Sequence, residues 1–376
     1  MTWTRQWQFN AEHGSLADVH EYAGAAGWAQ YEPFTISSAN KYSGAYSYKS
    51  QNYTAKAGGR QFDGTYPTMR ANFMLYHEGT EGPYDPPVPI AAVLLSGVPC
   101  TFYWDWYNNK IGFLAGWEYD TYNYRYPISG VPDTALAVVA NRWSTIGVAA
   151  HVSDTNGYVI LYIDGVEVMA WRGDTRVYAK MEIVPRAGID GFYAIGGGQG
   201  YGLLSLRGWK NTYVDDFYID SSPSFEAENP PPLRRFLPGY LSGNGDSSQW
   251  SPIGAATNYD AVSEPVSDKE ATYVKAGVPG LIDTYTLAPV DIPDNYVVRS
   301  ITPIADVLKT NAANPMTIRF LLKHNGETTE SADLNLPVDF GGFVWERMAS
   351  DLNGVGWTEA DLQNMQIGQK STGEFE

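Results

Sequence analysis

A pattern of three strands near the middle of the chain sets the strongest constraint on its fold. Apolar residues recur from 143 to 152, and a second run of strand-forming residues covers 158–163. Asp164-Gly165 follows directly and supplies the two positive-φ positions of a type I′ hairpin turn. The run at 166–171 then predicts a returning strand. We therefore predict an antiparallel meander over this segment.

Similar short apolar runs recur through the first 224 residues, where glycine, asparagine, aspartate and proline interrupt them. Their spacing is not helical, so this region is predicted to be β structure. Two sheets packed face to face bury the apolar sides of many antiparallel strands, which favours a sandwich or jelly roll over a closed barrel. The further predicted strands cover 73–76, 90–96, 101–107, 111–117, 134–140, 191–196 and 214–220.

A proline-rich segment divides the chain. Pro230-Pro231-Pro232 cannot donate to a sheet ladder and favours an extended polyproline conformation. We predict a jelly-roll domain over 1–224, a semi-rigid linker over 225–238 and a second β-sandwich domain over 239–376, the alternative being a long loop inside one domain. Strands of the second domain are predicted at 271–275, 281–287, 297–304, 316–323, 328–334 and 343–348, with a hairpin turn at 324–327.

One short helix is predicted near the C-terminus of an otherwise all-β chain. Thr358 has the side chain of an N-cap, and Asp361 stands three residues later, as in a capping box. The predicted helix runs from this point through Met365.

Charge and cysteine content exclude several classes of partner and setting. The chain has 25 Lys and Arg against 42 Asp and Glu, so its formal net charge is −17, which opposes binding to nucleic-acid phosphates. A single cysteine, Cys100, excludes an intrachain disulfide. The sequence shows neither a secretory signal pattern nor an apolar run of about 18 residues. We therefore expect a chain made in the cytoplasm, without nucleic acid or membrane as partner.

The search for catalytic and metal-binding motifs predicts a chain that is not an enzyme and holds no cofactor. Its 5 histidines are scattered rather than placed at ligand spacing. Acidic runs at 215–216 and 154–157 leave calcium binding open, although each lacks the closing glutamate of an EF-hand. Neither a Gly-x-Ser-x-Gly elbow nor a phosphate-binding loop occurs. Cys100 is interpreted as a core residue.

One strand pattern keeps an enzymatic alternative open. Glu118 and Asp120 stand two residues apart, which places both carboxylates on one face of a strand. They resemble the first two acids of the E-x-D-x-(x)-E strand of jelly-roll glucanases. The second catalytic glutamate is missing, because Tyr122 and Asn123 occupy its places. A jelly-roll glycoside hydrolase is therefore the weakest of three functional hypotheses.

An aromatic run predicts a recognition surface. Between Phe102 and Tyr126, 11 of 25 residues are aromatic. Alternate positions of a strand face opposite ways, so Phe102 and Trp104 share one face while Tyr103 and Asp105 share the other, and one set is core. Exposed rings would stack on sugars or anchor a protein contact, the alternative being an inert tyrosine-rich surface. The candidate binding residues are Trp104, Trp106, Trp117, Tyr119, Tyr122 and Tyr124.

Three motifs in the first half occur in an order typical of a known fold. They are NRW at 141–143, VILYIDGVEV at 159–168 and VDDFYID at 214–220. This order resembles the concanavalin A-like, laminin-G-like jelly rolls, which place a W…LYxDG hairpin before a closing V-D-D strand. The resemblance implies a fold that lectins, enzymes and adhesive modules share, so it implies no particular activity.

The second half carries a resemblance of its own. Its segments are FLPGYLSGNGDSSQWSPIG at 236–254, AVSEPVSDKEATYVKAG at 261–277, LIDTYTL at 281–287 and GWTEADLQNMQIG at 356–368. Together they resemble a β domain of virion accessory proteins of tailed bacteriophages, which often follows a lectin-like jelly roll. The resemblance implies a structural protein that decorates the capsid or belongs to a tail appendage. It brings no catalytic residues.

The leading hypothesis from the sequence is therefore a non-enzymatic virion accessory protein, assembled in the host cytoplasm as a homo-oligomer with other virion proteins. Residues 239–376 are predicted to hold the virion contact, and residues 1–224 to face outward. The alternative is a carbohydrate-binding adhesin or receptor-binding module that contacts a host-surface glycan through the aromatic run. Glycoside hydrolysis is the second alternative.

Overall fold

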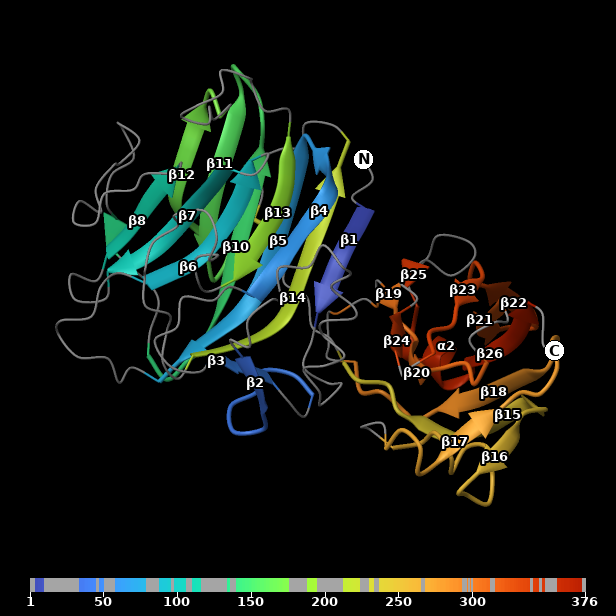
Figure 1. Ribbon diagram of the computed structural model, residues 1–376. Helices are drawn as coiled ribbons and strands as arrows, with labels where there is room; N and C mark the ends of the chain where they lie inside the picture. Colours follow the sequence, from blue (N-terminus) through green and yellow to red (C-terminus); the bar gives the residue numbers. More distant parts are fainter. Residues whose placement is uncertain are drawn as a thin grey trace. The chain divides into compact units, whose positions relative to one another are not determined.

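The structure is a computed structural model of the chain, and it contains several antiparallel sheets (Figure 1). Among the residues that it describes, α2 (Glu359–Gln363) is the one helix. The predicted all-β class with a short helix near the C-terminus is therefore confirmed. The described residues are 4–9, 34–44, 47–50, 58–78, 88–95, 98–105, 110–115, 134–135, 140–175, 188–194, 212–223, 230–232, 237–264, 268–292, 296, 298, 300–311, 315–338, 341–344, 347–348 and 357–373.

The chain divides into two compact units, with a division between Phe236 and Leu237. We call them the first unit and the second unit. The domain limits expected from the sequence, 1–224, 225–238 and 239–376, stay predictions.

The first unit contains a large sheet with the strand order β12-β11-β10-β5-β14-β3-β2. An additional strand, β1, also pairs with β14. The strands are β1 (Thr4–Phe9), β2 (Phe34–Ser37), β3 (Ser47–Ser50), β5 (Thr68–His77), β10 (Trp143–His151), β11 (Gly157–Ile163), β12 (Val166–Gly173) and β14 (Thr212–Ser222).

A small sheet of the same unit has the order β4-β13-β6-β7-β8-β9. Its strands are β4 (Gly58–Tyr66), β6 (Val88–Leu95), β7 (Val98–Asp105), β8 (Lys110–Ala115), β9 (Thr134–Ala135) and β13 (Ile189–Ala194).

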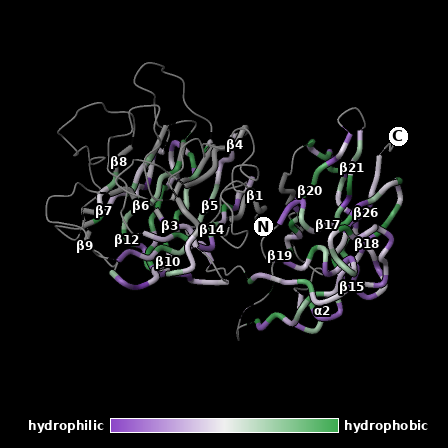
Figure 2. The backbone as a smooth tube through the Cα atoms, turned by 60° about the horizontal axis from the view of Figure 1, so that its bottom comes forward, coloured by the Kyte–Doolittle hydropathy of each residue, from purple (hydrophilic) through white to green (hydrophobic). Residues whose placement is uncertain are grey.

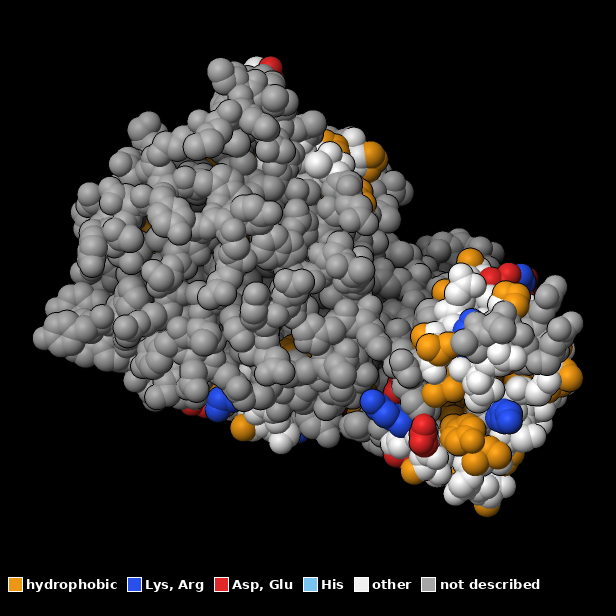
Figure 3. Space-filling model, in the orientation of Figure 1, with side chains coloured by type: hydrophobic (Ala, Val, Ile, Leu, Met, Phe, Trp, Pro, Cys, Tyr) orange, Lys and Arg blue, Asp and Glu red, His pale blue; other side chains and the backbone are white. Residues whose placement is uncertain are grey.

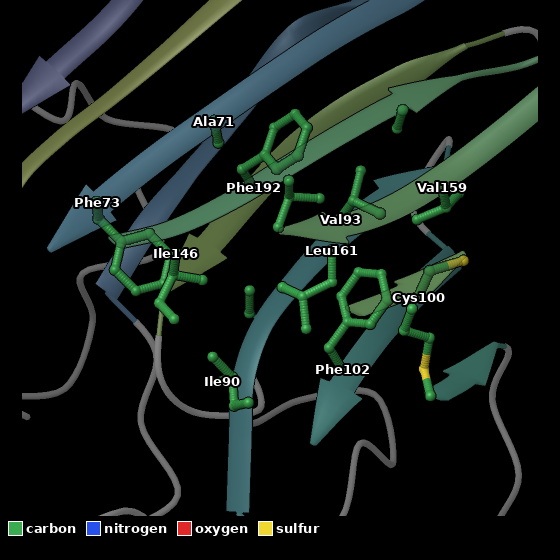
Figure 4. Close-up of a cluster of buried hydrophobic side chains, with 14 of the residues drawn as sticks. Ala71, Phe73, Ile90, Val93, Cys100, Phe102, Ile146, Val159, Leu161 and Phe192 are labelled. Carbon is green, nitrogen blue, oxygen red and sulfur yellow. The ribbon is translucent and has the colours of Figure 1, made fainter. Parts of the chain in front are cut away.

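Apolar side chains from both sheets meet between them and form the core of the first unit (Figure 4). The Phe73 and Phe217 rings of the large sheet lie 5.4 Å apart, and the Phe102 and Phe113 rings of the small sheet 4.8 Å apart. Cys100 is fully buried among them, and this burial raises the pKa of its thiol. The expected sandwich, with Cys100 in its core, is confirmed.

The predicted meander is confirmed as β10, β11 and β12. Ile146 of β10 pairs with Ile163 of β11, and the turn into β12 has positive φ at Asp164 (51°) and Gly165 (77°). The Asp164 carboxylate accepts a hydrogen bond of 2.8 Å from the Thr145 backbone N–H. The turn is therefore tied back to β10 by its own side chain.

The proline-rich segment contacts the outer face of the large sheet, the face turned away from the core. Pro231 is buried, and a Cβ atom added to Gly147 would lie 3.0 Å from its Cδ atom. The Tyr218 hydroxyl donates a hydrogen bond of 2.5 Å to the Pro232 carbonyl. Pro231 and Pro232 thus pack on the first unit.

The main sheet of the second unit has the order β15-β18-β26-β21-β22, and β23 pairs with β21. Its strands are β15 (Leu241–Ser248), β18 (Ile282–Leu287), β21 (Met316–His324), β22 (Glu327–Glu330), β23 (Leu334–Asn335) and β26 (Gln366–Gly373). Three two-stranded sheets join β16 (Ser251–Ile253) to β17 (Tyr273–Lys275), β19 (Ser300–Ile301) to β25 (Arg347–Met348), and β20 (Ile304–Val307) to β24 (Gly341–Val344).

Two local predictions for the second unit are confirmed. The 324–327 turn joins β21 to β22, with positive φ at Asn325 (50°) and Gly326 (81°). The capping box is present, since the Thr358 hydroxyl accepts from the Asp361 N–H at 3.2 Å and the Thr358 N–H donates to the Asp361 carboxylate at 2.8 Å. The helix ends at Gln363, two residues earlier than expected, because the chain enters β26 at Gln366.

Hydrophobic and hydrophilic stretches alternate along both units (Figure 2). Large apolar side chains on the described surface of the second unit are spread among polar ones (Figure 3). Those exposed there are Tyr240, Ile253, Val278, Tyr296, Ile304 and Val338. No helix in the described part of the chain has the length and hydropathy needed to cross a membrane.

Candidate functional site

The predicted aromatic surface lies mostly outside the described residues. Trp104 is in β7, where it pairs with Val88 and Ile111. Phe102 belongs to the core, and Tyr103 faces the other way, with its ring over Gly112. This confirms the expected alternation of faces. The candidates outside the described residues are Trp106, Trp117, Tyr119, Tyr122 and Tyr124, together with Glu118 and Asp120 of the hydrolase alternative.

The acidic pair at 215–216 has a structural role. One Asp215 carboxylate oxygen accepts hydrogen bonds from the N–H groups of Tyr42 and Ser43, both at 3.1 Å. The Asp216 carboxylate accepts one from the Ser43 hydroxyl at 2.7 Å. The pair therefore holds the turn around Tyr42 against β14. Within the described residues, no group of three or more His, Cys, Asp or Glu is arranged to hold a metal ion.

Two buried histidines on the large sheet are paired with threonines. His77 Nδ1 lies 3.1 Å from the Thr212 hydroxyl, and His151 Nδ1 lies 2.7 Å from the Thr68 hydroxyl. Burial lowers the pKa of both imidazoles, that of His77 to about 4. Both are neutral at neutral pH and act as parts of the packing.

A row of aromatic side chains crosses the outer face of the large sheet at one end. Trp143 at the start of β10 pairs with Tyr76 near the end of β5, and Tyr76 pairs with Tyr213 near the start of β14. The rings of Trp143 and Tyr76 lie 5.5 Å apart, and those of Tyr76 and Tyr213 lie 5.8 Å apart. Tyr42 extends the row, with its ring 5.8 Å from that of Trp143. We call these four residues the aromatic row.

Strand alternation explains why these rings point outward. Phe73 and Leu75 of β5 are buried in the core, so Tyr76 projects from the opposite face. The same alternation places Trp143 outward, because Ile146 and Val148 of β10 point into the core. Cross-strand neighbours on one face lie close enough for their rings to pack.

A carboxylate and an amide lie at the edge of the aromatic row. One Glu78 oxygen, Oε1, accepts a hydrogen bond of 2.8 Å from the Tyr213 hydroxyl and one of 3.2 Å from the Asn40 amide. The Lys49 ammonium lies 5.2 Å from the centre of the Tyr213 ring. Hydrogen bonding to Tyr213 is the largest effect and raises the pKa of Lys49; burial opposes it, and the Glu78 carboxylate adds a smaller upward effect.

The aromatic row is only partly covered. Tyr213 is buried, whereas Tyr42, Tyr76 and Trp143 are half-buried, as is Glu78. Half-buried rings fixed by neighbouring rings offer flat apolar surface, and the adjoining carboxylate and amide offer hydrogen bonds. This combination suits a ligand with both an apolar face and polar edges.

Sequence reasoning missed this site. Its four rings come from four segments, and none of them belongs to the aromatic run at 102–126. The positions of Tyr76 and Trp143 on the outward faces of their strands were the one available signal.

No protein-family model matches the chain, and neither does the sequence of any curated protein. Among solved structures, the marine PL-14 alginate lyase from Aplysia kurodai has 13% identity and a TM-score of 0.39, covering 58% of this chain and 100% of its own. The endo-1,3-beta-glucanase from Streptomyces sioyaensis has 14% identity and a TM-score of 0.29, covering 47% of this chain and 70% of its own. Basic winged bean lectin with Tn-antigen has 12% identity and a TM-score of 0.29, covering 51% of this chain and 94% of its own.

The prediction that the chain is not an enzyme is contradicted by this finding, because an alginate lyase and a glucanase are among the similar structures. That prediction depended on missing local motifs, above all the second catalytic glutamate after Asp120. Catalytic groups are also assembled from strands distant in sequence, which a motif search cannot detect. We therefore withdraw it.

Proposed function

We propose that the first unit binds carbohydrate on the outer face of the large sheet, with the aromatic row as its stacking surface. The observation that carries this proposal is the half-buried rings of Tyr42, Tyr76 and Trp143 beside the Glu78 carboxylate and the Asn40 amide.

The chemistry of a sugar matches this arrangement. A pyranose ring has a face of C–H groups, which packs on an aromatic ring, and an edge of hydroxyls, which donate to carboxylates and accept from amides. Rings that already pack against each other lose little side-chain entropy when a ligand stacks on them. The contacts among Trp143, Tyr76 and Tyr213 supply this rigidity.

The extent of the row favours a glycan chain over a single sugar. Trp143, Tyr76 and Tyr213 stand on three adjacent strands, β10, β5 and β14. Neighbouring strands lie about 4.8 Å apart, so the row crosses roughly 10 Å of the sheet. Tyr213 is the buried end of the row, and the half-buried rings of Tyr76 and Trp143 offer the surface over β5 and β10. The Tyr42 ring adjoins the Trp143 ring at 5.8 Å and adds a third half-buried ring to the surface.

A glycan array followed by affinity electrophoresis tests the proposal. Trp143→Ala removes the half-buried ring that contacts both Tyr42 and Tyr76, and it is expected to weaken binding at least about fivefold, equivalent to about 1 kcal/mol. Tyr240→Ala, which removes a ring that is 40% exposed in the second unit, is the matched control and is expected to leave binding unchanged. Release of reducing ends, followed in the same samples, reports whether bound glycan is also cleaved. Absence of binding to every glycan contradicts the proposal.

The sequence of the second half suggests the particle on which this binding takes place. The resemblance of 236–254 and 356–368 to a β domain of tailed-bacteriophage virion proteins supports a receptor-binding role on a virion, with a host-surface glycan as the target. Mass spectrometry of purified bacteriophage particles tests whether the chain is part of the virion. Absence of the chain from the particles overturns this role on a virion and leaves the binding proposal intact.

A further inference from the structure

We infer that the glycan bound at the aromatic row is a neutral, hydroxyl-rich one and that Glu78 selects it. This inference rests on the proposed function. It starts from the two oxygens of the Glu78 carboxylate, which have different surroundings.

One oxygen is occupied by the protein. Glu78 Oε1 accepts both the Tyr213 hydroxyl and the Asn40 amide. Within the described part of the chain, the other oxygen, Oε2, accepts no hydrogen bond, and Glu78 is half-buried rather than enclosed. The Oε2 atom is therefore an oriented acceptor at the edge of the aromatic row.

The two donors fix the direction of this acceptor. Tyr213 is 1% exposed, and its ring packs edge-on against that of Tyr76, so its hydroxyl has little freedom. Asn40 lies in the turn that also presents Tyr42, and Asp215 holds this turn against β14. Polar groups that are oriented before binding gain more affinity per hydrogen bond than mobile ones.

A carboxylate selects ligands by chemistry. It accepts hydrogen bonds and cannot donate them, so its partner must carry donors, as sugar hydroxyls do. The carboxylate or sulfate group of an acidic sugar would face a like charge at this position. The formal net charge of −17 adds a repulsion of the same sign at longer range.

Two cations lie near the aromatic row. The Lys49 ammonium lies 5.2 Å from the centre of the Tyr213 ring, whereas Arg142, next to Trp143, forms an ion pair with Asp164. The charge of Arg142 is thus offset by a carboxylate, and that of Lys49 lies over an aromatic ring. A preference for acidic glycans through Lys49 is the competing outcome of the test.

The experiment compares neutral and acidic polysaccharides by affinity electrophoresis of the full chain. The neutral probes are a β-1,3-glucan and a mannan, and the acidic probes are alginate and pectate. The wild-type chain is expected to be retarded by a neutral probe and not by either acidic one. Glu78→Gln keeps the size of the side chain and removes its charge, and we expect it to weaken neutral binding about tenfold. Glu327→Gln, in the exposed β21–β22 turn, is the matched control.

A second variant covers the case in which Glu78→Gln fails to fold. Asn40→Ala removes one of the two donors that orient Glu78, from a turn at the surface, and is expected to weaken neutral binding about threefold. Retardation of the wild-type chain by acidic probes alone overturns the inference. The inference is also overturned if Glu78→Gln and Asn40→Ala bind the neutral probe as tightly as the wild-type chain while Trp143→Ala loses binding. In both cases the proposed function survives. Failure to bind any probe overturns both.

Discussion

The Tyr213 hydroxyl donates a hydrogen bond of 2.8 Å to the carboxylate of Glu78, a residue 135 positions earlier in the chain. This bond joins the start of β14 to the residue that directly follows β5. It also connects the buried end of the aromatic row to the acceptor at its edge. The stability of this end of the large sheet and the orientation of the Glu78 carboxylate therefore depend on the same hydrogen bond.

Tyr213→Phe is expected to lower both stability and glycan affinity. The variant keeps the ring contact with Tyr76 and removes the donor, which costs about 1 kcal/mol of unfolding free energy. Chemical denaturation and affinity electrophoresis measure the two effects. Tyr296→Phe, at an exposed position of the second unit, serves as control and is expected to be neutral. An unchanged Tyr213→Phe variant would show that the bond has no role in either property.

His77 is expected to make the first unit less stable in mild acid. Burial lowers the folded-state pKa of His77 to about 4, below its ordinary value of 6.5. The unfolded chain therefore binds a proton first, so stability is full above pH 6.5, falls between pH 6.5 and about 4, and then levels off. The expected loss is on the order of 3 kcal/mol. His77→Gln should flatten this slope in denaturation curves across the range, and an equal slope in both proteins would contradict the account.

Replacement of Asp283 is expected to lower the unfolding free energy of the second unit more than replacement of a surface carboxylate does. Its carboxylate is fully buried and accepts from the Gln249 and Trp250 N–H groups at 2.6 and 2.8 Å, the Asn258 amide at 2.6 Å and the Tyr285 hydroxyl at 3.0 Å. Asp283→Ala removes the acceptor of four hydrogen bonds. The Gln249 N–H and the Asn258 amide also donate to the Ile282 and Trp250 carbonyls, but the Trp250 N–H and the Tyr285 hydroxyl lose the acceptor described here, so the variant should cost about 3 kcal/mol or more.

Asp246→Ala is the matched control for Asp283→Ala. Asp246 is 54% exposed and pairs with Lys323, so its loss should cost less than about 1 kcal/mol. Urea denaturation of both variants tests the contrast. Equal destabilisation would mean that the network around Asp283 contributes no more than a surface ion pair.

The cap of α2 is expected to weaken at low pH. Hydrogen bonds from the Thr358 hydroxyl and N–H lower the pKa of Asp361, so its stabilising effect is present above the ordinary aspartate pKa and is lost as the pH falls through the lowered value. Asp361→Asn should cost about 1 kcal/mol near neutral pH and nothing in strong acid. Glu359→Gln, in the same helical turn, is the control. A pH-independent cost for Asp361→Asn would refute this role.

Local patterns predicted local structure well. The Asp164-Gly165 and Asn325-Gly326 turns adopt the positive φ angles that their residue types favour, and Thr358 caps α2. Alternation within β7 predicted that Phe102 and Tyr103 face opposite ways, and the structure shows that the Phe102 side is the core. Each of these features is decided by residues within a few positions of each other.

Features decided by distant residues were missed. β26 lies between β18 and β21 in the main sheet, yet its sequence, QIGQKSTG, lacks the apolar alternation of a typical strand. Pairing with two neighbours, rather than propensity, makes it a strand. The aromatic row was missed for a related reason. The strand register that aligns Tyr76 with Trp143 and Tyr213 depends on three strands that are distant in sequence, so no single segment predicts it.

The central claim is that sugar rings stack on the aromatic row. A crystal structure of the chain with the tightest-binding oligosaccharide from the array tests it most directly. The account predicts a sugar ring packed on Trp143 and a sugar hydroxyl within about 3 Å of Glu78 Oε2. An oligosaccharide bound instead by residues of the 102–126 run, with the ring of Trp143 uncovered, would contradict it.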